Sequence, residues 1–373
     1  MSLLLKGNWE ILKLNKNSLN LERTLFSGQS FIWNIIENTE RLFIGTIKDN
    51  IVVLKENEID KDTIEYKFID SKQLVNDNNK MTEKQRKDEL INYFNLGYHI
   101  NDHLKQWKQD TEPDMKKKHS LNKQFCETYD KFQGLRLIRQ NPLDCLFSFI
   151  CSQNNNITRI SKMVKNLQSK YGSEITEVEG QKYYSFPSLD QLMNCKETEL
   201  NELGFGYRSK FIVQSAKQVK EKGGETWLMS LREKTHQDAH KELQTLMGVG
   251  QKVADCVCLF SLDKFDIVPV DTHVYKISQK HMPTLKKKKL SPAIYQEIRE
   301  FWKSRFGSQS GWAHTILFAN EISHFKKRPL EKPQQIENDN ETEVTEKKDD
   351  KNEEEEEEEE EEVKETKSKK LKR

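Results

Sequence analysis

Residues 246–256 read LMGVGQKVADC, and residues 268–273 read VPVDTH. Gly248 and Gly250 supply the permissive backbone that a tight turn between two helices requires. Apolar residues recur at helical spacing on both sides of these glycines, so one helix should end before the turn and another should begin after it. In the second stretch Asp271 stands where a helix N-cap is expected. The two stretches therefore predict a corner between two helices, followed closely by a third helix.

The glycine turn is also suited to binding a phosphate. Glycine lets backbone N–H groups approach an anion closely, and the N-terminus of the following helix carries partial positive charge. Gly248 and Gly250 alone are equally compatible with an ordinary corner in a helical protein. The lysine that follows them is what favours a functional site.

Lys252 shares one helix face with Cys256 and Phe260, because each follows the previous one by four positions. An amine, a thiol and an aromatic ring on one face suit the wall of a cavity. A surface lysine whose aliphatic stem packs on the protein is the alternative. Partial burial and the helix N-terminus would both favour the neutral amine, which is the form that attacks an electrophile. Asp271 can cap its helix with one oxygen while the other oxygen faces the same cavity.

Three further runs accompany these stretches. They are FSGQSFIW at residues 26–33, CLFSFICSQNNNITRI at residues 145–160 and LGFGYR at residues 203–208. Together with the glycine turn and Asp271, they resemble the eukaryotic 8-oxoguanine DNA glycosylase/AP lyases of the helix-hairpin-helix glycosylase superfamily. The resemblance extends from about residue 5 to residue 325.

The resemblance implies a base-excision repair enzyme that removes oxidised guanine (8-oxoguanine opposite cytosine) from double-stranded DNA. The damaged nucleotide is turned out of the duplex into a pocket. Lys252 attacks C1′ and displaces the base, and β-elimination from the resulting Schiff base nicks the strand. Asp271 stabilises the positive charge that develops on the sugar. The implied catalytic residues are therefore Lys252 and Asp271.

A base pocket is also implied by the resemblance. Cys256 and Phe318 hold the base between them, and the Gly28 carbonyl accepts a hydrogen bond from the N7–H group that oxidation creates. Phe260 and Pro269 line the same pocket. For Phe318, packing inside an ordinary helical core is the alternative.

His314 departs from the family, which usually has a glutamine here to read the Watson–Crick edge of the base. A neutral histidine offers one donor and one acceptor, so it replaces only part of that readout. We expect oxidised guanine still to be excised, and the activity to respond to pH near neutrality, where histidine ordinarily titrates. An altered lesion preference is the alternative.

A second group of residues is implied to contact the duplex. Asn154 fills the gap left by the displaced base, Arg159 and Arg208 accept the unpaired cytosine, and Tyr207 is a wedge beside it. Part of the asparagine run 154–156 should instead cap a helix. The remaining implied DNA contacts are Gly248, Gly250, His273 and Lys286. Lys286 belongs to a run of four lysines, for which a solvated loop is the alternative.

The expected fold class is α+β. Residues 1–125 contain a hairpin signal at 48–50 and a strand pattern at 64–68, which indicate mixed α and β structure. The resemblance implies that they form an antiparallel sheet domain like the TATA-binding fold. Residues 126–325 should form the all-helical helix-hairpin-helix glycosylase domain, with a helix start at Asn141 and Pro142. Residues 326–373 include an unbroken glutamate run at 353–362 and should be a disordered tail.

The charge of the chain is divided unevenly. The formal net charge is +1, yet the segment from Pro329 onward contains ten Lys/Arg and nineteen Asp/Glu, which leaves 51 basic against 41 acidic side chains in the body. A basic body suits a DNA partner. The terminal KSKKLKR resembles a nuclear import signal, so we expect a nuclear location and leave a mitochondrial pool open. The acidic run is either an arm for chromatin or repair-protein contacts or, more simply, an expansion without a role.

The six cysteines have neither metal-ligand nor disulfide spacing, and none follows residue 258. We therefore expect no cofactor and no catalytic metal. No apolar run approaches the ~20 residues of a membrane span, and we expect a monomer. The alternative from a different functional class is a DNA- or chromatin-binding protein without catalytic activity. The presence of both Lys252 and Asp271 disfavours this alternative.

Overall fold

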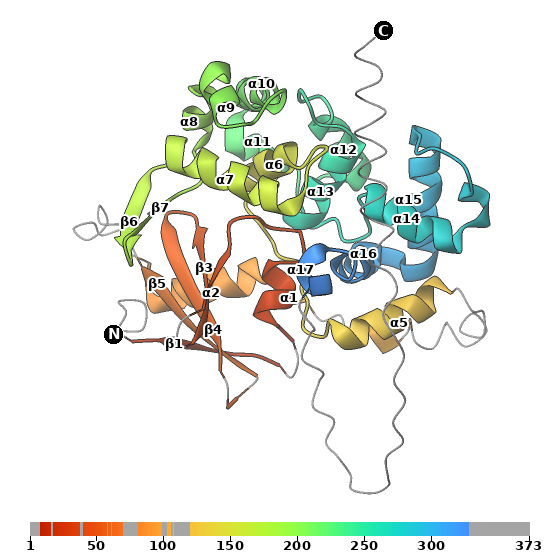
Figure 1. Ribbon diagram of the computed structural model, residues 1–373, viewed down its shortest axis with the longest axis horizontal. Helices are drawn as coiled ribbons and strands as arrows, with labels where there is room; N and C mark the ends of the chain where they lie inside the picture. Colours follow the sequence, from red (N-terminus) through yellow and green to blue (C-terminus); the bar gives the residue numbers. More distant parts are fainter. Residues whose placement is uncertain are drawn as a thin grey trace, which may run out of the picture. The chain divides into compact units, whose positions relative to one another are not determined.

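The computed structural model of the protein describes residues 8–15, 18–37, 40–57, 59–60, 62–69, 81–98, 103–105, 107 and 120–327. From residue 328 onward the predicted disordered tail, with its glutamate run and its basic terminus, lies outside the described residues. The described chain begins with a sheet and continues mainly as helices, as expected (Figure 1).

The sheet is antiparallel and has the strand order β1-β5-β4-β3-β2. Its central hairpin turns at Lys48, which adopts a left-handed φ of 54°, at the place that the sequence predicts. Ile64, Tyr66 and Phe68 alternate along one strand inside the sheet and are buried, also as predicted. The strands are β1 (Glu10–Lys13), β2 (Asn34–Glu37), β3 (Arg41–Ile47), β4 (Asn50–Glu56) and β5 (Thr63–Ile69).

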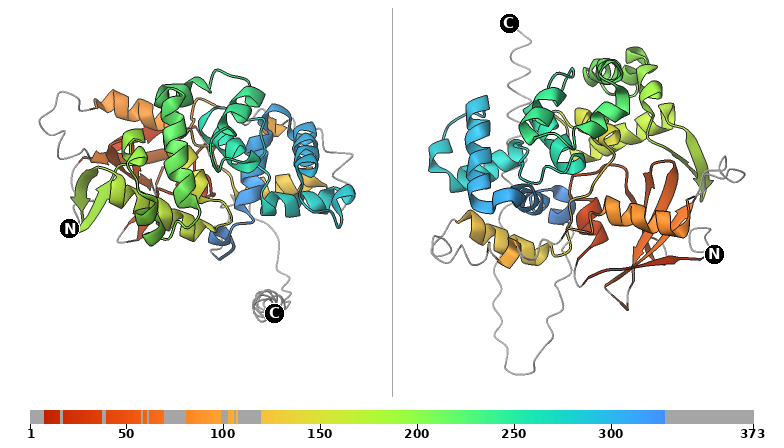
Figure 2. Two further views of the ribbon diagram at one scale, coloured as in Figure 1. Left: turned by 90° about the horizontal axis from the view of Figure 1, so that it is seen from above. Right: turned by 180° about the vertical axis from the view of Figure 1, so that it is seen from behind.

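Each face of this sheet is covered by a different element. On one face lies α2 (Glu83–Tyr93) (Figure 2). Its Leu90 and Tyr93 are buried in the core that the helix shares with the sheet. On the other face the buried side chains of β3 and β4 meet Ile175, Val178 and Tyr183. These three residues belong to a short hairpin of β6 (Glu174–Val178) and β7 (Gln181–Tyr184).

The β6–β7 hairpin departs from the all-helical domain that the sequence predicts for residues 126–325. Its turn residues Glu179 and Gly180 both have positive φ, 53° and 78°. Two successive left-handed residues are what a two-residue hairpin turn requires, because that backbone twist matches the twist of paired strands. The hairpin is therefore encoded locally and stabilised by its contact with the sheet.

The rest of the described chain is helical. Asn141 caps α6 with Pro142 in its first turn and Asn156 caps α7, both in agreement with the sequence, and Ser188 caps α8. Helix α5 crosses the predicted domain boundary at residue 125. The helices are α1 (Leu21–Leu25), α2, α5 (Leu121–Lys131), α6 (Pro142–Cys151), α7 (Ile157–Tyr171), α8 (Leu189–Met193), α9 (Glu197–Glu202), α10 (Arg208–Glu221), α11 (Gly224–Ser230), α12 (His236–Leu243), α13 (Gln251–Ser261), α14 (Thr272–His281), α15 (Pro292–Phe306), α16 (Ser310–Ala319) and α17 (Ser323–Lys327), with 3-10 turns η2 (Pro283–Leu285) and η3 (Gly307–Gln309).

Helix α13 lies at the centre of this helical part, against α6 and α12 (Figure 1). All its residues from Val253 to Ser261 are buried. Its first turn alone reaches the surface, so the fold presents Lys252 at the exposed end of a helix that is otherwise fixed in the core.

Gln29 joins the loop after α1 to the segment before α6. Its Nε2 donates to the Arg136 carbonyl oxygen at 2.7 Å, and its Oε1 accepts from the Ile138 N–H at 2.8 Å. The Gln140 side chain in turn donates to the Gln29 carbonyl oxygen at 2.8 Å. These bonds are buried and fix the backbone next to Gly28. Among the helices that the structure describes, none has the length and apolar character to cross a membrane.

Candidate active site

The glycine turn joins α12 to α13 as the sequence predicts. Gly248 has a φ of +78°, and a Cβ atom there would lie 2.4 Å from Cγ of Phe211. Gly250 is the N-cap of α13, is exposed, and has open space where a side chain would be. The first glycine is therefore required by packing and backbone geometry, whereas the second leaves the helix N-terminus open to an approaching anion.

Lys252 is half-buried in the first turn of α13 and faces α6. Its Nζ donates a hydrogen bond to Ser152 Oγ at 2.9 Å, and lies 5.2 Å from the centroid of the Phe149 ring. The Phe149 ring stacks on Phe260, with ring centroids 5.6 Å apart and an interplanar angle of 13°. The Lys252 amine therefore lies next to a hydroxyl group and close to two stacked aromatic rings.

Asp271 is the N-cap of α14, where its Oδ1 accepts the Val274 N–H at 2.9 Å. This confirms the predicted capping role. The charge of the Asp271 carboxylate also affects other side chains. Like the charge of Lys252, it shifts the pKa values of Cys256 and His314. The amine and the carboxylate therefore border one common group of buried side chains.

Cys256 and His314 are the titratable members of that group, and both are uncharged near neutral pH. Burial raises the pKa of the Cys256 thiol to about 12, and the charge of Lys252 opposes that rise. Burial lowers the pKa of the His314 imidazole to about 4, with Asp271 acting in the opposite direction and Lys252 in the same one. This lowered pKa argues against the expected response of His314 near neutrality, because burial disfavours the protonated ring.

The His314 ring lies among aromatic neighbours and is 5% exposed. It stacks on Phe318, with ring centroids 5.8 Å apart, while its Nδ1 makes no hydrogen bond within the described part of the chain. The Gly311 carbonyl acts on the ring from nearby and favours its protonated form. A buried ring nitrogen without a partner is costly, so Nδ1 is a candidate contact for a bound ligand.

Phe318 contacts predicted site residues from two other parts of the chain. The exposed ring of His273 meets it edge-on, with centroids 5.7 Å apart. Gly28, in the left-handed region at φ +81°, lies directly against it. Pro269 is buried in the segment between α13 and α14. The structure thus gathers residues from three distant parts of the chain around one site.

The four predicted readers of the duplex also lie together, where the α6–α7 loop meets the N-terminus of α10. Asn154 is exposed with a φ of 44°, and Tyr207 is 52% exposed with its hydroxyl donating to the Gln153 carbonyl oxygen at 3.1 Å. Arg159 is exposed and donates to the Gly204 carbonyl oxygen at 3.2 Å.

Arg208 differs from these three because it is only 3% exposed. Its guanidinium donates to the carbonyl oxygens of Gln153 and Asn154, the second at 3.0 Å, and packs over the Tyr207 ring at 4.5 Å. Its Nε has no hydrogen-bond partner among the described residues. In this structure Arg208 therefore shapes the loop that presents Asn154.

Lys286 lies apart from both groups. It is exposed after η2 and lines a separate surface cleft with Lys123, Lys280 and His281. Within the described ranges no group of three or more His, Cys, Asp or Glu side chains is arranged to bind a metal ion.

Sequence reasoning missed Ser152, Phe149 and Asp255. Ser152 and Phe149 lie in the run of residues 145–160, but nothing in the sequence pairs them with a lysine about one hundred positions later. Asp255 stands between Lys252 and Cys256 and is fully buried, surrounded by polar partners from α12 and α15. Its position three residues after Lys252 was the available signal.

Two protein families match the chain. Residues 11–146 match the family described as "8-oxoguanine DNA glycosylase, N-terminal domain", and residues 147–304 match the "HhH-GPD superfamily base excision DNA repair protein". These two matches cover both the sheet and the helical part that contains the glycine turn.

Individual relatives extend over most of the chain. It is 36% identical to the N-glycosylase/DNA lyase OGG1 of Arabidopsis thaliana, over 90% of this chain and 87% of that protein. It is 31% identical to the N-glycosylase/DNA lyase of Saccharomyces cerevisiae, over 83% and 85%. Among solved structures, the Clostridium acetobutylicum 8-oxoguanine glycosylase/lyase bound to double-stranded DNA with cytosine opposite 8-oxoG matches with a TM-score of 0.68 and 28% identity, covering 84% of this chain and 95% of that one.

Proposed function

The chain belongs to the family of 8-oxoguanine N-glycosylase/DNA lyases and is a bifunctional base-excision repair enzyme; on that premise we propose that it acts on 8-oxoguanine paired with cytosine, with Lys252 as the nucleophile. The observation that carries the assignment of Lys252 is its position. The amine borders a group of buried side chains and is hydrogen-bonded to Ser152. Its charge, like that of Asp271, acts on Cys256 and His314 in this group.

The proposed reaction begins with the neutral amine of Lys252. Its lone pair forms a bond to C1′ of the everted nucleotide, and the glycosidic bond breaks with its electron pair leaving on the base. The Ser152 hydroxyl accepts a hydrogen bond from Nζ and so orients the amine. The sugar then opens to a protonated Schiff base on Lys252. Loss of a proton from C2′ expels the 3′ phosphate and nicks the strand.

Asp271 supplies the compensating charge. One of its oxygens is committed to the Val274 N–H at 2.9 Å, which fixes the orientation of the carboxylate. The other can face the sugar as it becomes positive. An oriented charge in a site from which water is largely excluded stabilises a transition state more than the same charge in water does.

The base would be recognised by the pocket residues. The Gly28 carbonyl is proposed to accept the N7–H of the oxidised base, and Cys256 and Phe318 to contact its two faces. The neutral thiol and ring suit this role because neither repels an uncharged base. The unpartnered Nδ1 of His314 would bond the base edge, and Pro269 and Phe260 would line the wall.

The duplex is proposed to bind where the exposed readers lie, with the glycine turn and His273 on its phosphates. Arg208 would act by holding the loop that carries Asn154. For the whole chain we propose a monomer in the nucleus, with a mitochondrial pool left open. Contacts of the acidic tail with chromatin or repair proteins remain a proposal as well.

Trapping with borohydride tests the nucleophile. Borohydride reduces a Schiff base between an amine and an abasic sugar to a stable covalent adduct. We expect an adduct with an 8-oxoguanine·cytosine duplex that disappears in Lys252→Ala. An adduct that survives in Lys252→Ala would overturn the assignment, and a parent without adduct or base release would favour the DNA-binding alternative.

A second candidate function is a glycosylase of the same family with altered lesion preference. The observation that favours it is His314, whose neutral ring cannot present the amide that glutamine would. A panel of duplexes that varies the lesion and the opposite base separates the two. A clear preference for a lesion other than 8-oxoguanine would favour the second candidate.

A further inference from the structure

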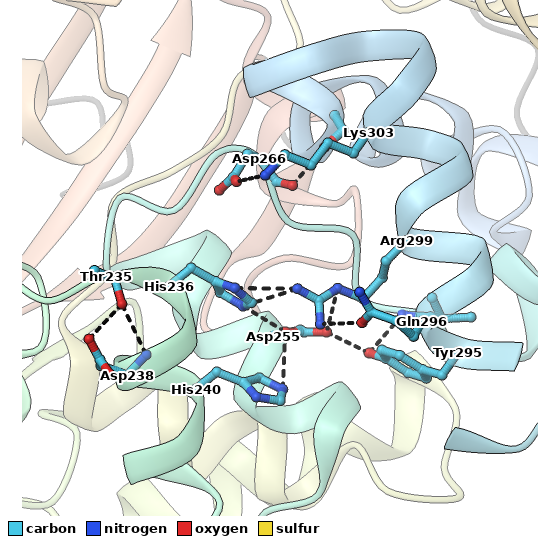
Figure 3. Close-up of polar contacts among 12 residues, drawn as sticks. Thr235, His236, Asp238, His240, Asp255, Asp266, Tyr295, Gln296, Arg299 and Lys303 are labelled. Atoms are coloured by element: carbon cyan, nitrogen blue, oxygen red, sulfur yellow. Dashed lines mark hydrogen bonds and ion pairs between the residues drawn. The ribbon is translucent and has the colours of Figure 1, made fainter. Parts of the chain in front are cut away.

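A cluster of polar side chains surrounds Asp255 on helix α13 (Figure 3). Asp255 has no exposed surface. From α12, His236 Nε2 lies 3.2 Å and His240 Nε2 3.3 Å from its Oδ1. From α15, Tyr295 donates its hydroxyl hydrogen to Oδ2 at 2.8 Å, and Arg299 Nε lies 3.8 Å from Oδ2.

One branch of this cluster continues to the catalytic segment. The Tyr295 hydroxyl, which donates to Asp255, accepts the N–H of Val270 at 3.0 Å. Val270 directly precedes Asp271. At the other end, Asp255 is three residues after Lys252 on α13 and directly precedes Cys256. A chain of two hydrogen bonds therefore runs from the backbone beside Asp271 to the helix that carries Lys252.

We propose that Asp255 and Tyr295 are positioning residues, which set the separation between the Lys252 amine and the Asp271 carboxylate through the Val270 N–H. This inference rests on the proposed function. The pair does not contact substrate. Through the Tyr295 hydroxyl it links helix α13, which carries Lys252, to the backbone that directly precedes Asp271.

The energetics of burial support a role in geometry. A buried carboxylate beside an arginine is a weak source of net stability, because its desolvation offsets much of the attraction. The carboxylate instead fixes geometry. The two hydrogen bonds of 2.8 and 3.0 Å restrict the movement of residue 270 relative to helix α13. Misplacement of a reacting group by 1 Å can slow a reaction by about 100-fold.

The first test is Tyr295→Phe, which removes one hydroxyl and keeps the ring. Its matched control is Tyr93→Phe, because the Tyr93 hydroxyl is also buried, accepting the Trp33 Nε1–H at 2.8 Å, but belongs to the N-terminal core. For both variants and the parent, base release is measured in a single turnover at saturating enzyme. Affinity is measured separately on a duplex with a non-hydrolysable 8-oxoguanine nucleotide, and folding by thermal melting.

We expect Tyr295→Phe to slow base release at least about tenfold while its affinity for the duplex changes by less than about threefold. Tyr93→Phe should keep both quantities within about twofold of the parent, whatever its melting temperature. A parental rate in Tyr295→Phe overturns the proposal. So does an equal loss of rate and affinity in the two variants, which would mean general destabilisation.

Asp255→Asn provides a second variant if Tyr295→Phe does not fold. It keeps a neutral acceptor for the tyrosine hydroxyl, so we expect a loss of rate of about threefold without loss of affinity. The proposal is overturned if Asp255→Asn releases the base at the rate of the parent while Tyr295→Phe either does not fold or also keeps that rate. A parent protein that releases no oxidised base would instead overturn the proposed function itself, and the two failures are thereby distinguished.

Discussion

The ring of Phe318 lies against the backbone of Gly28 so closely that a Cβ atom on residue 28 would be 2.8 Å from Cε1 of Phe318. Gly28 comes from the loop after α1, and Phe318 from α16 near the end of the described chain. Two residues that the sequence assigns separately to the base pocket are thus direct neighbours.

Substitution of Gly28 by alanine should impair the pocket in two ways. Alanine is strained at a φ of +81°, and its methyl group would displace Phe318. We expect a loss of stability of about 1–2 kcal/mol and a fall in base release of at least tenfold, measured by urea unfolding and single-turnover kinetics. Gly97→Ala is the matched control, because no atom lies within 4 Å of its added Cβ. Unchanged base release in Gly28→Ala would contradict the assigned contact.

The His314 ring should not govern the pH dependence of activity near neutrality. Its pKa is lowered to about 4 by burial, so it stays neutral between about pH 5.5 and pH 8.5. We expect parallel profiles of rate against pH for the parent and His314→Gln over that interval. Profiles that diverge around pH 6.5 would mean that the ring titrates in the usual range.

The same ring should make the protein sensitive to acid. A histidine whose pKa is lower in the folded state than in the unfolded state takes up its proton on unfolding, so its contribution to stability is present above pH 6.5 and is lost as the pH falls towards 4. Between these limits we expect the parent to lose about 2 kcal/mol more than His314→Gln. Urea unfolding of both proteins at each pH measures the difference, and equal losses would refute it.

The two arginines near the α6–α7 loop should respond differently to substitution by glutamine. Arg208 is buried and donates to loop carbonyls, so Arg208→Gln should cost about 2–3 kcal/mol of stability and loosen the loop around Asn154. Arg159 is exposed, so Arg159→Gln should weaken binding to the duplex with a change in stability of less than about 0.5 kcal/mol. Thermal melting and DNA affinity, measured opposite each base, separate the two effects. Similar destabilisation by both substitutions would contradict this division.

The two glycines of the turn should also differ. Gly248→Ala places a methyl group 2.4 Å from Phe211 Cγ at a φ of +78°, so it should destabilise the turn by about 2 kcal/mol or more. Gly250→Ala meets open space and should leave stability nearly unchanged while weakening DNA binding. Equal affinity of Gly250→Ala and the parent at low salt would argue against a phosphate at this N-terminus.

Much of this fold could be predicted because its signals are local. Caps such as Asn141 and Asn156 and the turn at Lys48 depend on residues within four positions, and the structure has them where expected. The β6–β7 hairpin carried an equally local signal in Glu179 and Gly180. It was missed because the surrounding sequence is helical and its burial depends on a sheet formed more than one hundred residues earlier.

The sequence predicts which residues belong to the candidate site better than it predicts how their side chains are arranged. Family motifs identify Lys252, Asp271 and Phe318, yet the Ser152 hydroxyl that binds Lys252 depends on how α6 packs against α13. The same is true of protonation: whether His314 titrates near neutrality depends on its depth in the core, which sequence spacing does not reveal.

The bonds of Gln29 have a consequence for recombination between relatives. Its amide is tied to the carbonyl of Arg136 and the N–H of Ile138, so the loop bearing Gly28 is held by backbone that leads into the helical part. Because both partners of the Gln29 amide are backbone groups, a chimera keeps these bonds wherever its N-terminal module carries a glutamine at position 29. A module with another residue at position 29 would leave these two buried backbone groups without the bonds that fix the loop beside Gly28.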